Sequence, residues 1–319
     1  MSISLTSHRP GLAVALKLGA IFLFVIMSGI IKASSQEVPP GQAVFFRSFF
    51  AIPVILTWLA ARGELRQGLI TQKPTLHVVR GVIGTTTMAL TFTGLGLLPL
   101  PEVTAIGFAA PIFTVILAAI VLGERIRLIR VSAVLIGLCG VIIMLWPRLT
   151  GVNNLGDGAT LGALLLLGAT FLRSVIQIHV RQMVATEHTA AIVFYFSVTA
   201  SVVALLTVPL GWAIPAFEWV MPSNQMVGML IGAGCLGGLA QILITSSYRF
   251  AGAAMLAPYD YSSMLFAILV GYLWFGELPT LIMLSGASLV IAGGVLVIWR
   301  ERQLGMERDK TRSVTDPKA

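Results

Sequence analysis

The feature that most constrains this sequence is a succession of apolar runs, each long enough to cross a lipid bilayer as a helix. A membrane-spanning helix needs roughly 20 consecutive, mostly apolar residues. Ten such runs can be delimited between turn and charge signals. They lie at approximately 12–32, 42–61, 76–97, 102–122, 128–147, 159–180, 189–210, 225–246, 253–275 and 280–299. The sequence therefore predicts an all-α integral membrane protein with ten transmembrane helices and no separate soluble domain.

The composition excludes an ordinary soluble protein. Only 11% of the 319 residues are charged and 57% are hydrophobic, whereas about 25% of the residues of a soluble domain carry a charge. In so apolar a chain the net charge of +8 is not a nucleic-acid-binding signal, and no nucleic-acid partner is expected. Both cysteines, Cys139 and Cys235, lie in apolar runs, so we expect no disulfide framework, metal site or cofactor.

The basic residues predict an orientation. If both termini are cytoplasmic, most Lys and Arg residues fall on or near the inner side, namely Arg9, Lys17, Arg62, Arg66, Lys73, Arg80, Arg125, Arg127, Arg130, Arg181, Arg249, Arg300, Arg302, Arg308, Lys310, Arg312 and Lys318. Lys32 and Arg148 fall near the outer side, and Arg47 and Arg173 lie within spans. Cytoplasmic loops carry the excess of basic residues, so we expect a multi-pass protein of the bacterial inner membrane, with a basic cytoplasmic tail over 301–319.

Two segments of the chain repeat each other. Residues 121–147 align with 274–300 without a gap, and identical positions include the pairs Gly123 with Gly276, Glu124 with Glu277, Ser132 with Ser285, Gly140 with Gly293 and Trp146 with Trp299. The repeat predicts two five-span halves, 12–147 and 159–300, and because five is odd the second half is inverted in the membrane. Inverted repeats with a substrate site at their junction are a recurring plan of secondary transporters. A duplication that serves packing alone is the alternative.

A family resemblance rests on short motifs that recur in order. The first half contains Lys32, Pro40 and Arg47, then Pro111 and an LGE segment ending at Glu124, then a helix with Gly137 and Gly140; the second half repeats them with Pro258 and an FGE segment ending at Glu277. Over nearly the whole chain the sequence resembles the EamA family of the drug/metabolite transporter superfamily. The resemblance implies two inverted halves around a central cavity with alternating access. The second half departs from it, because it has no clear counterpart of Lys32 and Arg47.

Charged and polar residues inside predicted spans are the candidate site residues, because such groups usually face a cavity or a partner. The expected substrate contacts are Arg47, Tyr259, Ser262, Asp260, Gln241 and Thr91, and the expected gating or structural residues are Lys32, Arg173, Pro111, Pro258, Glu124 and Glu277. Tyr259 shares the more polar helix face with Ser262, so we expect Tyr259 to stack on the solute and Tyr261 to support the fold.

Each of these assignments has a structural alternative. Lys32 and Arg47 lie near the outer edge, where long side chains can reach water. The tyrosines of the ninth span fit an interfacial belt as well as a cavity wall. Glu124 and Glu277 follow glycines at span ends, where pairing with a basic loop neighbour is the expected role. Lys32 and Arg47 are treated as unmatched cations of the outer side.

The function expected from these features is secondary transport rather than catalysis. The sequence contains no GxxxxGK[ST] loop and no HExxH motif, and no nucleophile or metal set can be assembled from it. Flux should therefore follow a substrate or ion gradient. The chain is similar to the riboflavin importers of the family, so riboflavin uptake is the first function expected and export of amino acids or related small metabolites the second. A scaffold or receptor without transport is the alternative of another class. The expected partners are a small-molecule substrate and the bilayer, and a homodimer is left open.

The orientation can be tested with reporter fusions. Because the 148–158 loop joins the two halves after five spans, a reporter inserted there should read periplasmic in a Gram-negative host. Fusions within 62–75 should read cytoplasmic and serve as the control. A cytoplasmic reading at 148–158 would contradict the ten-span arrangement.

Overall fold

The computed structural model describes residues 10–110, 112–114, 116–117, 128–149, 157–183, 186–250, 256–296 and 299. Within these residues the chain is helical and contains no strand, as expected for an all-α membrane protein. Six of the described helices or helix pairs are long and apolar enough to cross a bilayer, namely Gly11–Ser34, Pro40–Ala61, Pro74–Leu97, Gly158–Val180, Ala190–Gly211 and Asn224–Ser247. Shorter apolar helices, such as Leu281–Leu296, accompany them.

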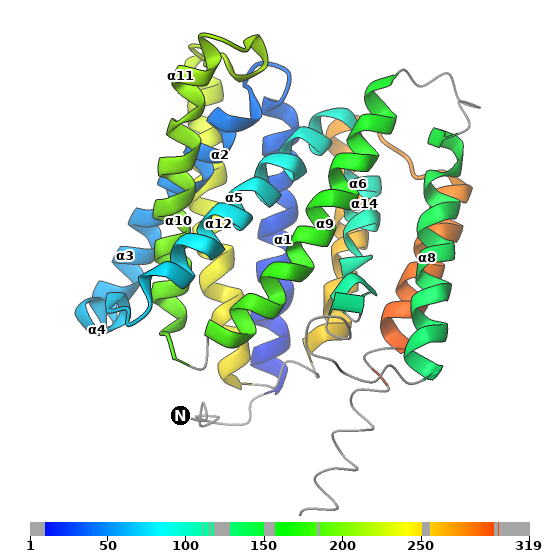
Figure 1. The fold of residues 1–319 in the computed structure, drawn as a ribbon, viewed down its shortest axis with the longest axis horizontal. Coiled ribbons are helices and arrows are strands. Elements are labelled where there is room, and N and C mark those ends of the chain that lie inside the picture. Colours follow the sequence, from blue (N-terminus) through cyan, green and yellow to red (C-terminus); the bar gives the residue numbers. More distant parts are fainter. Residues whose placement is uncertain are drawn as a thin grey trace, which may run out of the picture.

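Where the structure describes them, most of the predicted apolar runs are helical, and Figure 1 shows how the helices are arranged. In chain order they are α1 (Pro10–Ser34), α2 (Pro40–Phe49), α3 (Ala51–Ala61), α4 (Leu65–Leu69), α5 (Pro74–Leu97), α6 (Leu100–Gly107), α8 (Leu128–Leu149), α9 (Asp157–Met183), α10 (Thr189–Leu205), α11 (Thr207–Gly211), η1 (Pro215–Phe217), α12 (Asn224–Phe250), η2 (Ala257–Tyr261) and α14 (Ser262–Phe275). Helix Leu281–Leu296 follows α14. The short helices α4 and η1 lie in segments that the sequence treats as loops.

Prolines divide two of the predicted spans. The run 42–61 forms α2 and α3, separated at Phe50, and the run 189–210 forms α10 and α11, separated at Leu206. In each case a proline follows three residues after the break, Pro53 and Pro209 respectively. A proline has no N–H for the carbonyl four residues before it, and its ring clashes with that carbonyl. Each break therefore follows from the covalent structure, and both helix pairs remain long enough to span.

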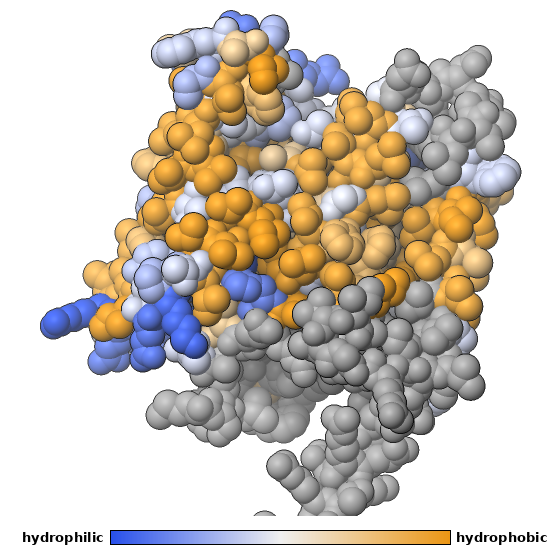
Figure 2. Space-filling view, viewed as in Figure 1, coloured by the Kyte–Doolittle hydropathy of each residue, from blue (hydrophilic) through white to orange (hydrophobic). Residues whose placement is uncertain are grey.

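Helix α1 lies at the centre of the bundle. It packs most extensively against α12 and also contacts α14 and α5, while α5 packs against α9 and α10. In Figure 1, α8 lies at the opposite edge of the molecule from α3 and α4. Figure 2 shows a broad hydrophobic belt around the middle of one face, with hydrophilic residues gathered at the α4 end. This distribution fits a bundle whose middle is surrounded by lipid.

Two glycines, Gly140 and Gly286, allow the backbones of α8 and helix Leu281–Leu296 to come into contact. A Cβ atom added to Gly140 would lie 2.6 Å from the Gly286 carbonyl oxygen and 2.8 Å from the Val290 nitrogen. A Cβ added to Gly286 would lie 2.6 Å from the Gly140 carbonyl oxygen and 2.9 Å from the Met144 nitrogen. Because lipid tails are as apolar as the side chains, helix association in membranes depends on such close packing of small residues.

This packing predicts that Gly140→Ala and Gly286→Ala each destabilise the protein by about 1–3 kcal/mol, since the added methyl group meets backbone atoms that cannot move away. Thermal unfolding of the purified protein in detergent measures the change. Gly228→Ala is the matched control, because a Cβ there meets nothing within 4 Å and alanine is the better helix former. Equal effects at all three positions would contradict the proposed contact.

Candidate functional site

The polar side chains inside the bundle form an ion pair near each end of α1, a pair of arginines between α2, α5 and α10, and a carboxylate cluster beside the start of α10. We name the two ends of the bundle by the residues of α1 that mark them. The Lys17 end is where α1 begins, and the Lys32 end is where α1 finishes.

At the Lys17 end, Lys17 is buried and forms an ion pair with Asp260. The Lys17 Nζ lies 2.7 Å from the Asp260 Oδ1, and the side chains are 1% and 52% exposed respectively. From the sequence, Lys17 was expected to be one of the inner-side basic residues and Asp260 to be a substrate contact. The structure joins them between α1 and η2, so the Asp260 carboxylate already neutralises a buried charge.

At the Lys32 end, Lys32 and Glu277 form a second ion pair. The Lys32 Nζ lies 2.9 Å from the Glu277 Oε1 and donates hydrogen bonds to the carbonyl oxygens of Leu98 at 2.6 Å and Leu95 at 3.3 Å. The Glu277 Oε2 accepts a 2.8 Å hydrogen bond from the Leu100 backbone N–H, at the start of α6. The carboxylate thus satisfies a donor at a helix N-terminus, where negative charge is favourable.

This second pair corrects two expectations. Lys32 was taken as an unmatched cation, but Glu277 neutralises it. The expected partner of Glu277 was a basic loop neighbour, whereas the actual partner is the last-turn lysine of α1. The reason is tertiary packing: Gly276 adopts φ +65° immediately after α14 and turns the chain toward the end of α1.

The two ion pairs fix the relative direction of α1 and α14. Asp260 precedes α14 and pairs near the start of α1, while Glu277 follows α14 and pairs near the end of α1. The two helices therefore run in the same direction, side by side. The paired lysines are 15 residues apart, or about 22 Å along the helix axis. One ion pair therefore links α1 to the η2–α14 segment at the Lys17 end, and a second ion pair links them at the Lys32 end.

Two arginines approach one aromatic ring in the interior. The Arg47 Cζ of α2 lies 5.9 Å from the centroid of the Phe196 ring, and the Arg80 Cζ of α5 lies 4.3 Å from it. Arg47 is 8% exposed, and Phe196 belongs to α10. Among the described residues no carboxylate forms an ion pair with either guanidinium, and the two positive charges repel each other.

This arrangement is costly in an apolar environment. A cation–π contact contributes up to about 2 kcal/mol when desolvated, whereas burying an ion costs several kcal/mol. The pair is therefore not explained by its contacts with Phe196 alone. The sequence proposed Arg47 as a substrate contact but treated Arg80 as an inner-side charge. The missed signal was available, because Arg80 lies inside the predicted span 76–97.

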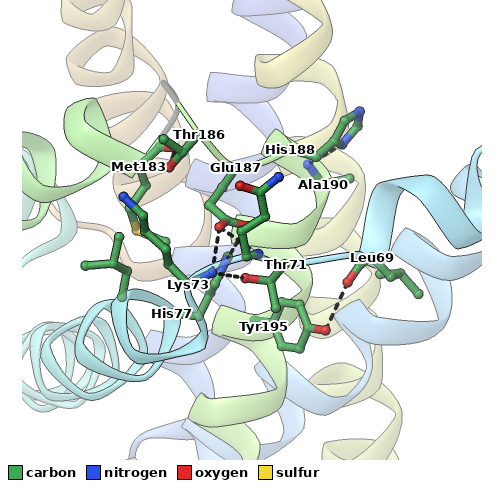
Figure 3. Close-up of polar contacts among 12 residues, drawn as sticks. Leu69, Thr71, Lys73, His77, Met183, Thr186, Glu187, His188, Ala190 and Tyr195 are labelled. Carbon is green, nitrogen blue, oxygen red and sulfur yellow. Dashed lines mark hydrogen bonds and ion pairs between the residues drawn. The ribbon is translucent and has the colours of Figure 1, made fainter.

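A buried carboxylate cluster joins the start of α5 to the start of α10 (Figure 3). The Glu187 carboxylate accepts hydrogen bonds from the backbone N–H groups of Gln72 and Lys73, both at 3.0 Å, and lies 3.1 Å from the His77 Nε2. The His77 ring packs against Tyr195 with centroids 4.9 Å apart. Sequence reasoning missed Glu187, because no local pattern distinguishes it from a loop acid.

The hydrogen bonds of Glu187 outweigh its burial. Burial raises the pKa of the Glu187 carboxyl, but the hydrogen bonds from the His77 and Thr71 side chains and from the Gln72 and Lys73 backbone lower it further, so the net pKa lies below the usual 4.5. Glu187 precedes the first turn of α10, outside the spans. The cluster ties together two connections that lie far apart in the sequence.

The hydroxyl groups of two further predicted substrate contacts donate hydrogen bonds to nearby backbone carbonyl oxygens. The Thr91 hydroxyl donates to the Thr87 carbonyl oxygen at 2.7 Å, and the Ser262 hydroxyl donates to the Tyr259 carbonyl oxygen at 2.7 Å. Tyr259 is 36% exposed. Gln241 is half-buried on α12, where it lines a shallow crevice together with Ile55, Trp58, Ala190, Val193, Ile242 and Thr245.

Other predicted residues have mixed outcomes. Tyr261 packs edge-on against Phe108 with centroids 5.2 Å apart and borders the main hydrophobic core. Arg173 is exposed on α9, with its guanidinium beside Gly107 of α6. Pro111 and Glu124 lie outside the described residues. The backbone of Pro258 lies in the 3-10 helix η2, but its side chain is not among those described.

Comparisons with known proteins agree on one family. The model of the EamA-like transporter family matches residues 11–146 and again residues 160–299. The pseudopaline exporter of Pseudomonas aeruginosa is 30% identical over 280 residues, which cover 88% of this chain and 90% of that protein. The S-adenosylmethionine uptake transporter of Rickettsia prowazekii is 27% identical over 82% of this chain and 84% of its own. The riboflavin transporter of Vibrio cholerae is 27% identical over 95% of this chain and 98% of its own.

A solved structure shares the fold. One crystal structure matches with a TM-score of 0.61 at 19% sequence identity, covering 90% of this chain and 97% of that chain. At this identity the likeness concerns the fold alone. The family and the relatives' names identify transporters rather than enzymes.

The Glu187 cluster predicts a pH-dependent contribution to stability. Because the pKa of Glu187 is lowered on folding, its contribution is present above the unfolded pKa of 4.5 and is lost as the pH falls through the folded pKa. Glu187→Gln should therefore lower the stability at neutral pH by about 1–3 kcal/mol, and the difference from the wild type should shrink on acidification. Thermal unfolding as a function of pH measures this, with the exposed Glu37→Gln as the control. A pH-independent difference would contradict the assignment.

Proposed function

Because the chain belongs to the EamA-like transporter family, we propose that it is a secondary transporter of a small metabolite in the bacterial inner membrane, with both termini cytoplasmic. We propose ten spans in two inverted halves, 12–147 and 159–300, followed by a cytoplasmic tail over 301–319. The double match of one family model supports the two halves. The common direction of α1 and α14 supports them too, since the first and ninth of ten spans must run the same way.

The observation that carries the mechanism is the pair of salt bridges between α1 and the η2–α14 segment. In the proposed arrangement α1 belongs to the first half and η2–α14 to the second. Lys17–Asp260 joins the halves near one membrane side and Lys32–Glu277 joins them near the other. Alternating access rocks one half of the protein against the other, so each side opens when its salt bridge breaks. The structure, with both salt bridges formed, then corresponds to a state closed at both ends.

Two substrate classes compete. Riboflavin uptake, the expectation from the sequence, is supported by the relative named as a riboflavin transporter. Export of amino acids or related small metabolites, the second expectation, is supported by the relative named as a pseudopaline exporter and by the two buried arginines, which suit an acidic group.

Direct transport assays test the function. Proteoliposomes containing the purified chain should exchange one of three labelled solutes, riboflavin, S-adenosylmethionine or a mixed amino-acid pool, faster than empty liposomes. Rescue of a riboflavin auxotroph at low external vitamin tests uptake in cells. We expect flux to follow the solute gradient without ATP. Well-folded protein that exchanges none of the three would favour a scaffold or receptor.

The salt-bridge mechanism predicts that Lys32→Ala and Glu277→Gln slow transport, because the closed state at that end is weakened. Coupling energies between conformational states are typically about 1–3 kcal/mol, which change a population ratio about 5–150-fold. The Lys32→Glu, Glu277→Lys double variant should recover part of the rate, since it restores opposite charges. Recovery should be incomplete, because the hydrogen bonds to Leu98 and Leu100 need the original arrangement. Single variants that transport at the wild-type rate would contradict the gating role.

A further inference from the structure

The guanidinium groups of Arg47 and Arg80 reach Phe196 from opposite ends of the bundle. Arg47 lies seven residues after Pro40, the first residue of α2. Arg80 lies six residues after Pro74, the first residue of α5. With a rise of about 1.5 Å per residue, each Cα is about 10 Å inside the end at which its helix begins. Both side chains therefore carry a permanent positive charge well into the apolar region, and neither is a loop residue.

Among the described residues, these guanidinium groups lack the carboxylate partners that the interior lysines have. Lys17 and Lys32 each pair with a carboxylate. By contrast, the Nε and Nη1 atoms of Arg80 are buried with no hydrogen-bond partner among the described residues. Among the same residues Arg47 forms no ion pair, and it lies near the Phe196 ring and the Arg80 charge. An arginine cannot lose its charge in response. Buried donors left in this way point to a missing acceptor.

Both guanidinium groups pack directly against glycines. A Cβ atom on Gly84, one turn after Arg80 on α5, would overlap the Arg80 Nη1 and lie 2.6 Å from the Phe196 ring. A Cβ on Gly237 of α12 would lie 3.2 Å from the Arg47 Nε. The positions of the two guanidinium groups therefore depend on the absence of a side chain at Gly84 of α5 and at Gly237 of α12. An alanine at either position would push a guanidinium group out of its present place.

We propose that Arg47 and Arg80 together bind an oxyanion, a carboxylate or phosphate group, of the transported solute. The proposal rests on the transport function above and specifies its substrate class. A guanidinium presents N–H donors in a planar fork that matches a carboxylate or phosphate. A bound oxyanion would accept the free donors of Arg80, neutralise part of the charge of both arginines and lie between α2, α5 and α10. A neutral solute would leave both charges uncompensated.

A binding measurement tests the site without requiring transport. The full-length purified protein is titrated with sodium acetate or inorganic phosphate at constant ionic strength, with sodium chloride and uncharged acetamide as probe controls. The melting temperature should rise saturably with acetate or phosphate. At ten times the dissociation constant, the folding equilibrium should shift about elevenfold. The more effective of the two anions identifies the group as a carboxylate or a phosphate.

Variants assign the effect to the two arginines. In Arg47→Gln and Arg80→Gln the saturable shift should disappear. It should persist in the control Arg62→Gln, where an exposed arginine lies 5.1 Å from the Trp58 ring. The ligand-free Arg80→Gln protein should melt at or above the wild-type temperature, because an unpaired buried charge has been removed. If a glutamine variant does not fold, Arg47→Lys and Arg80→Lys retain the charge without the fork, and should require a higher anion concentration.

The outcomes separate this proposal from the transport function. An equal shift in the wild type and the glutamine variants, an equal response to chloride or acetamide, or no anion-dependent shift in folded wild-type protein would overturn the arginine site. If the protein nevertheless exchanges riboflavin, the transport function stands. A saturable, arginine-dependent shift in protein that moves none of the tested solutes would support the binding site and count against the transport function.

Discussion

Every charged group that enters an apolar bundle must be compensated, because hydrocarbon offers no water to replace the lost hydration. Even the lowest estimates give a free-energy cost of about 3 kcal/mol for a lysine, arginine or aspartate at the centre of a membrane helix. The two lysines of α1 meet this requirement through carboxylates from the opposite end of the sequence. The positions of α1, η2 and α14, and with them the centre of the bundle, therefore depend on charge compensation as well as on close packing.

The need for charge compensation is also compatible with the proposed role of these two salt bridges in gating. In the proposed arrangement both lie between elements of different halves. Their side chains are not equally buried: Asp260 is half exposed, while Lys32 and Glu277 are mostly covered. A salt bridge that can be rehydrated on opening is cheaper to break than one in a sealed core. Under the proposed mechanism, a few kcal/mol would then separate the closed and open states, which is about the range over which a bound solute can shift a population.

The arginines around Phe196 show the opposite situation, in which compensation is incomplete. Unfavourable arrangements that persist in a folded protein are concentrated at functional sites, and ionisable residues within membrane helices mark substrate or ion pathways by default. The hydroxyl-rich face of α5 differs in this respect. Its threonines donate to carbonyl oxygens of their own helix one turn earlier, so they satisfy themselves and require no ligand.

The sequence by itself determined the class of the protein and most of its helical runs. The breaks at Phe50 and Leu206 were not predicted, although they follow from local sequence. Span length and hydrophobicity are local properties, and Pro53 and Pro209 break their helices through covalent geometry alone. Only the tertiary structure decided which charges are paired. Lys32 meets Glu277, Lys17 meets Asp260 and Glu187 reaches the start of α5, because packing brings together residues that lie far apart in the chain. The position of Arg80 inside the predicted span 76–97 was visible in the sequence, but its approach to Phe196 depends on how α5 packs against α10.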